Sequence, residues 1–183
     1  MRPKHIVAAL TALLVLGLAG EAFALDAWRD RRGLLFGVGI GAGSSQSDVK
    51  DAESHIGFNF SARVGGGVNK QLTLDAEIGL QKATFDQNDV DIAQDIFTGF
   101  IGANYFIMDG LYGRVMGGVA HIGVELDPGK DDDETGTGFG FGAGYEFFAT
   151  ADLAVGLGAD FRYLSFDDAA FTMINFGVTG TWY

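Results

Sequence analysis

Seven charged residues are the first candidates for chemistry, because each interrupts a segment that is otherwise apolar or rich in glycine. The positive ones are Arg63, Arg114 and Arg162, and the negative ones are Asp75, Glu77, Glu146 and Asp160. Charges removed from water must be paired, and the guanidinium fork suits a carboxylate partner. These residues predict an ion-pair network, extended by Asn59, Gln81, Asn104 and Asn175. Such a network acts either as a structural plug, which we favour, or as a gate or proton path.

Other motifs with possible chemistry are weak. The glycines from Gly37 to Gly43 resemble a dinucleotide loop, but the helix and the acidic residue of a βαβ unit do not follow. Asp131 to Glu134 offers oxygen ligands without the spacing of an EF-hand, so we interpret it as a solvated acidic segment. The chain has no cysteine. The sequence therefore predicts no catalytic residue, no cofactor and no metal site.

The elements that position these charges are strands. Apolar residues alternate with glycine or polar residues in eight segments, a period of two that is typical of strands of about 9 to 13 residues. The segments are residues 34–43, 56–68, 72–81, 97–107, 111–126, 138–147, 153–163 and 173–182. In 111–126 the apolar set passes from Val115 and Val119 to Ile122 and Val124, which predicts a glycine bulge near Gly117-Gly118.

The connections between these segments alternate in length. Short ones fall near residues 69–70, 108–110 and 149–152, and long ones span 44–54, 82–95, 127–136 and 164–170. The long connections hold most of the acidic residues. An even number of antiparallel strands can close and so remove exposed edges. The pattern predicts an all-β, eight-stranded, antiparallel up-and-down transmembrane barrel, with both termini on the side of the short turns.

The apolar set is predicted to face lipid. A soluble barrel, the alternative, would expose the opposite set, which is rich in glycine and poor in charge. Inside a narrow lumen the same glycines would leave room for long polar side chains. Aromatic rings prefer the level of the lipid headgroups. The predicted aromatic girdle consists of Tyr105, Tyr112, Tyr145, Phe147, Tyr163 and Trp182.

The first 24 residues have the features of a secretory signal peptide. Arg2 and Lys4 precede an apolar run, and Ala22-Phe23-Ala24 supplies the small residues of a cleavage site. We therefore expect residues 1–24 to be removed and residues 25–183 to form the barrel domain. The formal net charge of −12 argues against a nucleic acid partner, which would require a basic face.

The leader, the eight alternating segments and the final run Asn175-Phe176-Gly177-Val178-Thr179-Gly180-Thr181-Trp182-Tyr183 carry a resemblance. The chain resembles the small outer-membrane β-barrel superfamily, which includes the transmembrane domain of outer-membrane protein A and the opacity-type porin-like surface proteins. The resemblance implies a location in the outer membrane of a Gram-negative cell envelope. It also implies contact with outer-membrane lipid and lipopolysaccharide, and recognition of the terminal aromatic residue, here Tyr183, by the barrel-assembly machinery.

Some barrels of this kind hydrolyse lipid A acyl chains with a serine, a histidine and an acidic residue. Glu53, Ser54 and His55 offer these types, but adjacent residues on a strand point to opposite faces. His121 lacks the serine two positions further on that such lipases have. The predicted function is a structural or surface-interaction role for a monomer with a closed lumen. A narrow small-solute channel is the alternative, and a lipid A-modifying enzyme is less favoured.

Overall fold

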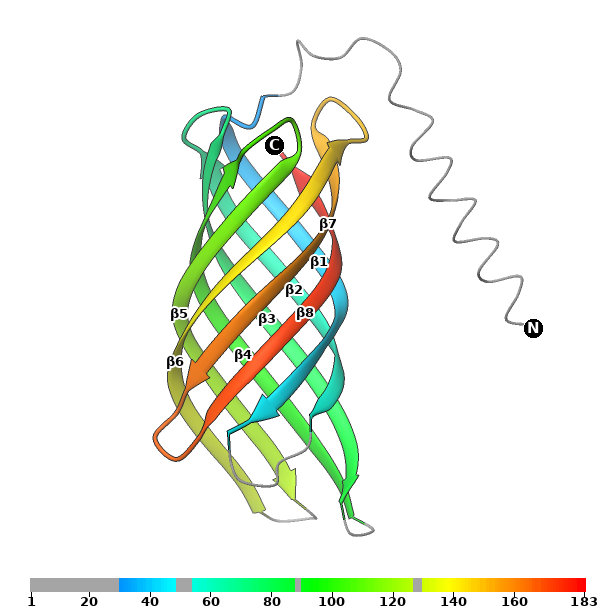
Figure 1. Cartoon of the computed structure of the whole chain (residues 1–183), viewed down its shortest axis with the longest axis vertical. Helices are drawn as coiled ribbons and strands as arrows, with labels where there is room; N and C mark the ends of the chain where they lie inside the picture. The colour runs from blue at the N-terminus through cyan, green and yellow to red at the C-terminus, as the bar shows by residue number, and fades with distance from the viewer. Residues whose placement is uncertain (1–29, 49–53, 88–89, 127–129) are drawn as a thin grey trace, which may run out of the picture.

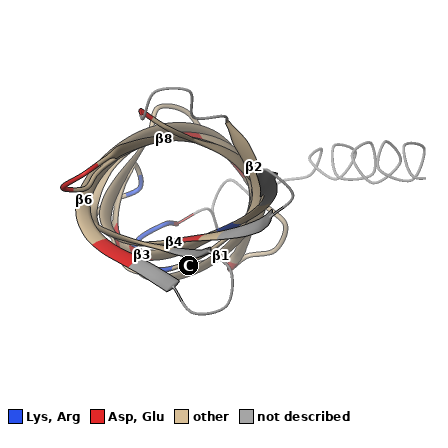
Figure 2. Cartoon of the chain, turned by 90° about the horizontal axis from the view of Figure 1, so that it is seen from below, with Lys and Arg blue, Asp and Glu red and all other residues tan. Residues whose placement is uncertain are grey.

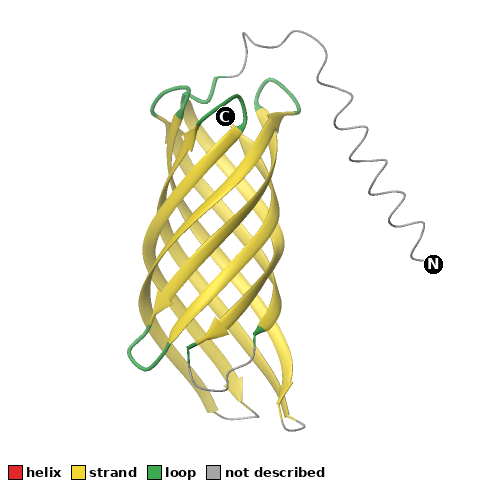
Figure 3. Cartoon of the chain, in the orientation of Figure 1, coloured by secondary structure: helices red, strands yellow, loops and turns green. Residues whose placement is uncertain are grey.

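Eight strands account for most of the chain whose structure is described. The computed structural model describes residues 30–48, 54–87, 90–126 and 130–183, so the predicted signal peptide lies outside it. The strands are β1 (Gly33–Ser47), β2 (His55–Gly67), β3 (Leu72–Gln87), β4 (Val90–Phe106), β5 (Leu111–Leu126), β6 (Lys130–Phe148), β7 (Leu153–Ser165) and β8 (Ala170–Trp182). Short loops, green in Figure 3, join strands at residues 68–71, 107–110, 149–152 and 166–169. In the described residues, no helix is long and apolar enough to cross a membrane.

The strands form one closed antiparallel barrel in chain order, as the sequence predicts (Figure 1). The first and last strands pair from Phe36 opposite Trp182 to Ser47 opposite Phe171, which completes the ring. Seen along its axis, the barrel is a single wall around one lumen (Figure 2). Closure gives every strand two neighbours, so neither β1 nor β8 leaves an unpaired edge.

The two ends of the barrel differ. At the short-turn end, the strands are joined by residues 68–71, 107–110 and 149–152. β1 begins and β8 ends at this same end (Figure 1). At the opposite end, called the hairpin end below, β3 and β4 continue as a pair to Gln87 and Val90, and β5 and β6 to Leu126 and Lys130.

The expectation of long loops at residues 82–95 and 127–136 is therefore wrong. The described residues of these two ranges extend the strands, and the longest strand has 19 residues rather than about 13. The polar composition suggested loops, but an antiparallel hairpin keeps its backbone hydrogen bonds with polar side chains as well as with apolar ones. The ion pair between Lys82 and Asp95, at 2.6 Å, joins two directly opposed residues of this extension.

The predicted bulge in β5 is also absent. The pairing of β5 with both neighbours is continuous through Gly117 and Gly118. Ile122 keeps the inward phase of Arg114 and is only 5% exposed. The apolar residue faces inward because the lumen is itself apolar at this level, so no change of phase is needed.

Inward-facing glycines make room for long side chains from neighbouring strands. A Cβ atom at Gly37 would lie 2.6 Å from Nε of Arg63, and one at Gly102 would lie 2.8 Å from Nη2 of Arg114. A Cβ at Gly144 would lie 2.5 Å from the hydroxyl of Tyr112. Contacts this short exclude even a methyl group unless the neighbour moves, so the glycines allow the polar lumen to be filled.

Candidate functional site

The middle of the lumen is crossed by a chain of ion pairs from three strands. Arg114 on β5 binds Asp75 at 2.6 Å and Glu77 at 3.2 Å, both on β3. Arg162 on β7 binds the other oxygen of Glu77 at 3.0 Å and Asp160 at 2.6 Å. Glu77 therefore joins two guanidinium groups. The arrangement ties opposite walls together and occupies the space through which a solute would pass.

Amide side chains complete the hydrogen bonding of these carboxylates. Asn104 donates to Asp75 at 2.7 Å and to Thr73 at 3.0 Å. Asn175 donates to Asp160 at 3.0 Å and accepts a hydrogen bond from Asn59 at 3.2 Å. These bonds satisfy carboxylate lone pairs that would otherwise be buried without a partner. Among the described residues, the buried Oδ1 of Asn104 has no partner of its own.

Arg63 lies apart from this chain of ion pairs. It stands opposite Glu77 in the β2–β3 register, yet its side chain runs along Gly37 and donates from Nη2 to the hydroxyl of Thr181. Within the part of the chain that is described, no carboxylate lies within 4.0 Å of it. Cross-strand register therefore does not bring together all of the predicted pairs.

A second layer closes the short-turn end. Arg31, which precedes β1, places Nε 2.7 Å from Glu146, and both side chains are buried. Its guanidinium carbon lies 3.8 Å from the centre of the Phe106 ring and 5.4 Å from that of Phe148. The Tyr183 hydroxyl donates to Glu146, with oxygen distances of 2.9 and 3.1 Å. Burial, together with the charge of Glu146, raises the pKa of Tyr183 far above its ordinary value.

Arg31 is the functional residue that the sequence reasoning missed. It lies outside the alternating segments, so its side chain had no predicted face. The available signal was the charge count, because three predicted lumen arginines faced four carboxylates. With Arg31 included, four arginines and four carboxylates are found in the described lumen, although Asp160 is only partly buried, and Arg31 supplies the counter-ion of the buried Glu146.

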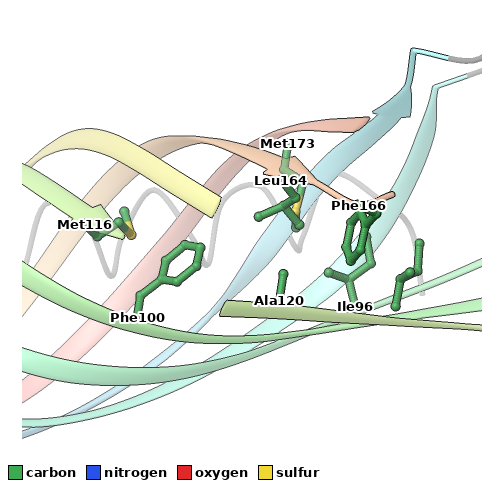
Figure 4. Packing of buried hydrophobic residues seen from close by; sticks show 8 residues of the cluster. Ile96, Phe100, Met116, Ala120, Leu164, Phe166 and Met173 are labelled. Carbon is green, nitrogen blue, oxygen red and sulfur yellow. The ribbon is translucent and has the colours of Figure 1, made fainter. Parts of the chain in front are cut away.

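A third layer, at the hairpin end, is apolar (Figure 4). It is called the apolar plug here and consists of Ile96, Phe100, Met116, Ala120, Ile122, Leu164, Phe166 and Met173. Phe166 comes from the β7–β8 turn and packs edge-on against Phe171, with ring centres 5.8 Å apart. Glu134 accepts hydrogen bonds from the backbone amides of Asp167 and Asp168 and so holds this turn.

A cavity of about 90 Å³ remains among the polar side chains of the lumen. It is bordered by Arg63, Arg114, Tyr112 and Asp160. Nε of Arg63 and Nε of Arg114 are buried, and among the described residues neither has a hydrogen-bond partner. A cavity of this volume holds several water molecules, which would satisfy such groups.

The predicted girdle residues divide between the two faces of the wall. Tyr105, Tyr145, Tyr163 and Trp182 are exposed on the outside, and Phe147 has the same outward phase. The prediction that Tyr112 belongs to the girdle is wrong. Tyr112 is only 8% exposed and lies in the lumen against Phe106, with ring centres 5.4 Å apart. It shares the phase of Arg114, and its hydroxyl lies over Gly144, so it belongs to the filled interior.

His121 stands apart from the lumen network. His121 faces outward, with Nδ1 3.1 Å from the Thr135 hydroxyl and Nε2 3.9 Å from Asp133. His55 begins β2, opposite Ser45, and Glu53 lies outside the described residues. Over the described ranges, no group of three or more metal-ligating side chains comes together. The side chains of Asp131 and Asp132 lie outside those ranges.

The outer wall carries the bulky apolar residues of the alternating segments. Phe36, Ile40, Phe58, Ile78, Ile101, Val115, Phe141, Leu157 and Phe176 are all exposed there. This inverted arrangement, with apolar side chains outside and charges inside, is what a hydrocarbon solvent requires of a closed barrel.

The fold resembles solved surface proteins at low sequence identity. Neisserial surface protein A is 12% identical with a TM-score of 0.62, and the match covers 81% of this chain and 96% of that one. Ail, the attachment invasion locus protein of Yersinia pestis, is 16% identical with a TM-score of 0.58 and coverage of 81% and 98%. Ail solved in complex with the heparin analogue sucrose octasulfate is 15% identical with a TM-score of 0.59. That match covers 81% of this chain and 99% of that one.

No curated protein sequence matches the chain. The sequence profile described as outer membrane protein beta-barrel domain, by contrast, matches residues 10–181, which is nearly the whole chain. Together with the closed barrel and its apolar outer wall, this match places the protein in the bacterial outer membrane. The chain belongs to the outer membrane protein beta-barrel domain family.

Proposed function

We propose that this outer membrane barrel has a structural or surface-interaction role and does not conduct solutes. The observation that carries the proposal is the filled lumen. A solute would have to pass Arg31 and Glu146, then the Glu77 ion pairs, and then the apolar plug. Each layer has a different chemistry, so no single class of solute would find a favourable path.

The surface presented at the hairpin end is acidic. The described carboxylates there include Asp48, Asp133, Asp167 and Asp168, and all four are exposed. Ail was solved with a sulfated ligand, but these carboxylates would repel a polyanion. We therefore propose that this end meets neutral or cationic groups, with divalent ions able to bridge it to lipopolysaccharide phosphates.

Several further features belong to the same proposal. The chain is exported with removal of residues 1–24, is inserted with Tyr183 as the assembly signal, and remains a monomer. Tyr105, Tyr145, Phe147, Tyr163 and Trp182 form the interfacial girdle. No catalytic role is proposed, since His121 is paired across the strand with Thr135 and the alternating phase separates Ser54 from His55.

Single-channel recording tests the closed lumen. Purified protein folded in detergent and added to planar bilayers is expected to give no reproducible unitary conductance. Glu77→Gln provides the lumen variant, and Lys82→Gln, which alters an exposed ion pair, provides the matched control. A stable wild-type conductance that Glu77→Gln changes and Lys82→Gln does not would refute the closed lumen.

That result would instead support the second candidate, a narrow channel for small solutes. The specific observation in its favour is the cavity of about 90 Å³ beside Arg63 and Arg114, whose Nε groups lack partners among the described residues. Water held in this cavity would contact the ion-paired side chains. Movement of one arginine side chain would then lengthen or shorten the row of water molecules along the lumen.

A further inference from the structure

The environment of Arg31 has the chemistry of a binding site for a cation. A carboxylate, Glu146, receives the guanidinium at 2.7 Å, and Phe106 presents its ring face at 3.8 Å. Phe148 lies on a further side, at 5.4 Å, and packs against Tyr183 with ring centres 5.5 Å apart. We call these four residues, Phe106, Glu146, Phe148 and Tyr183, the cation cage.

The cage is built by the barrel, and its ligand comes from outside the strands. Phe106 ends β4, and Glu146 and Phe148 lie at the end of β6, whereas Arg31 precedes β1. The Arg31 carbonyl occupies the position that a Cβ of Gly67 would need, so β2 leaves space for this segment. An aromatic face and a buried carboxylate are the groups that recognise organic cations in proteins.

The Phe106 side of the cage borders an opening at the short-turn end. A cavity of about 580 Å³ opens there, bordered by Arg31, Phe106, Lys70 and residues 107–109. A dissolved molecule with a guanidinium head could approach the cage from this side, and it would reach Glu146 only when Arg31 leaves. Arg31 itself is 5% exposed and Glu146 is 2% exposed, so the contact is desolvated.

We propose that the short-turn mouth is a guanidinium-binding site whose resident ligand is the chain's own Arg31. The segment before β1 is then a tethered plug. When Arg31 leaves, Glu146 and the aromatic rings bind a guanidinium group from another molecule, and the mouth of the lumen opens toward the cavity. The tether keeps the effective concentration of Arg31 high, so the resting state is the occupied one.

Chemical rescue tests the site. Arg31→Ala is expected to lower the temperature at which the detergent-folded barrel unfolds in SDS, because Glu146 loses its cation. Millimolar methylguanidinium, which reproduces the arginine head, is expected to restore at least half of that shift. Urea at the same concentration has a similar shape without the charge and is expected to restore nothing.

Two variants serve as controls. Arg32→Ala removes the neighbouring arginine, which is exposed and paired with Asp30, and is expected to show neither the loss nor the rescue. Arg31→Ala combined with Glu146→Gln lacks the carboxylate and is expected to be insensitive to methylguanidinium. Absence of rescue in Arg31→Ala, or equal rescue in the double variant, would overturn the site.

A measurement on the wild-type protein covers the case in which Arg31→Ala does not fold. The Nε proton of Arg31 is buried and bonded, so its exchange with solvent is expected to be at least tenfold slower than that of Arg32. Added methylguanidinium is expected to speed it, because the displaced side chain is exposed. Exchange of Arg31 as fast as that of Arg32, or unaffected by methylguanidinium, would also overturn the proposal.

Discussion

At the scale of single residues, the filling of the lumen depends on which inward glycines lie beneath the long side chains of neighbouring strands. Tyr112 lies over two inward glycines, since a Cβ at Gly144 would lie 2.5 Å from its hydroxyl and one at Gly158 would lie 3.1 Å from it. Gly113, the next residue after Tyr112, faces outward and has no atom within 4 Å of a Cβ position. The inward Gly144 on β6 and the outward Gly113 on β5 thus differ in whether a Cβ atom has room.

Gly144→Ala is expected to destabilise the barrel by about 1–3 kcal/mol, because the new methyl group displaces the Tyr112 ring. Gly113→Ala is the matched control and is expected to be neutral. Urea unfolding in micelles measures both. In a double-mutant cycle, Tyr112→Leu should remove part of the Gly144→Ala penalty, and the rest comes from the Leu157 carbonyl oxygen, 2.7 Å from the Cβ position. Additive effects of the two substitutions would show that the ring is not the obstacle.

At the scale of elements, the β7–β8 turn is a separate unit that covers the apolar plug. Phe166 enters the barrel from this turn. Glu134 on β6 accepts hydrogen bonds from the backbone amides of Asp167 and Asp168 in the turn. On the other side, Ala170 donates to Asp48 at 2.9 Å. The turn is therefore held by Glu134 on β6, and the first residue of β8 beside it is held by Asp48, which follows β1.

Glu134→Ala is expected to raise the hydrogen-exchange rates of the Asp167 and Asp168 amides about tenfold or more, since a charge-assisted bond contributes about 1.5–3 kcal/mol. Glu134→Gln retains an acceptor oxygen and should raise them less. Amide exchange followed by NMR distinguishes the two. Unchanged rates in Glu134→Ala would mean that Phe166 alone holds the turn.

Much of the arrangement of the strands could be predicted from the sequence. Alternation gave the eight strands, their order and the outward phase of residues such as Phe36 and Phe141. The strand ends were not predictable, because hydrogen bonding continues through polar residues such as Lys82 and Asp95. The phase of Ile122 was misjudged on the assumption of a polar lumen throughout, and nothing local in β5 signals the apolar plug.

At the scale of the whole molecule, stability depends on ties across the lumen. Glu77 on β3 binds both Arg114 on β5 and Arg162 on β7. One carboxylate therefore links three strands, none of which is adjacent to another. The ion-pair types were predictable from charge, but the pairs were not. Arg63 binds Thr181 rather than Glu77, and Glu146 binds an arginine outside the strands.

Glu77→Gln is expected to reduce the free energy of unfolding by about 3–5 kcal/mol, since it leaves two buried arginines short of a counter-ion. Lys82→Gln, which breaks an exposed pair, should cost about 1 kcal/mol or less. Equilibrium unfolding in urea with lipid vesicles provides the comparison. Equal losses for the two variants would indicate that the lumen pairs are solvated.

The pairing of β1 with β8 has a consequence for the history of such chains. This seam carries the same kind of antiparallel ladder as every other seam, from Phe36 opposite Trp182 to Ser47 opposite Phe171. The hydrogen-bond ladder by itself therefore does not mark where the chain begins, which is shown only by the missing turn between β8 and β1. Duplication, loss or circular shuffling of whole hairpins can conserve the ladder, so barrels of this kind can diverge by rearranging hairpins while their residues drift beyond recognition.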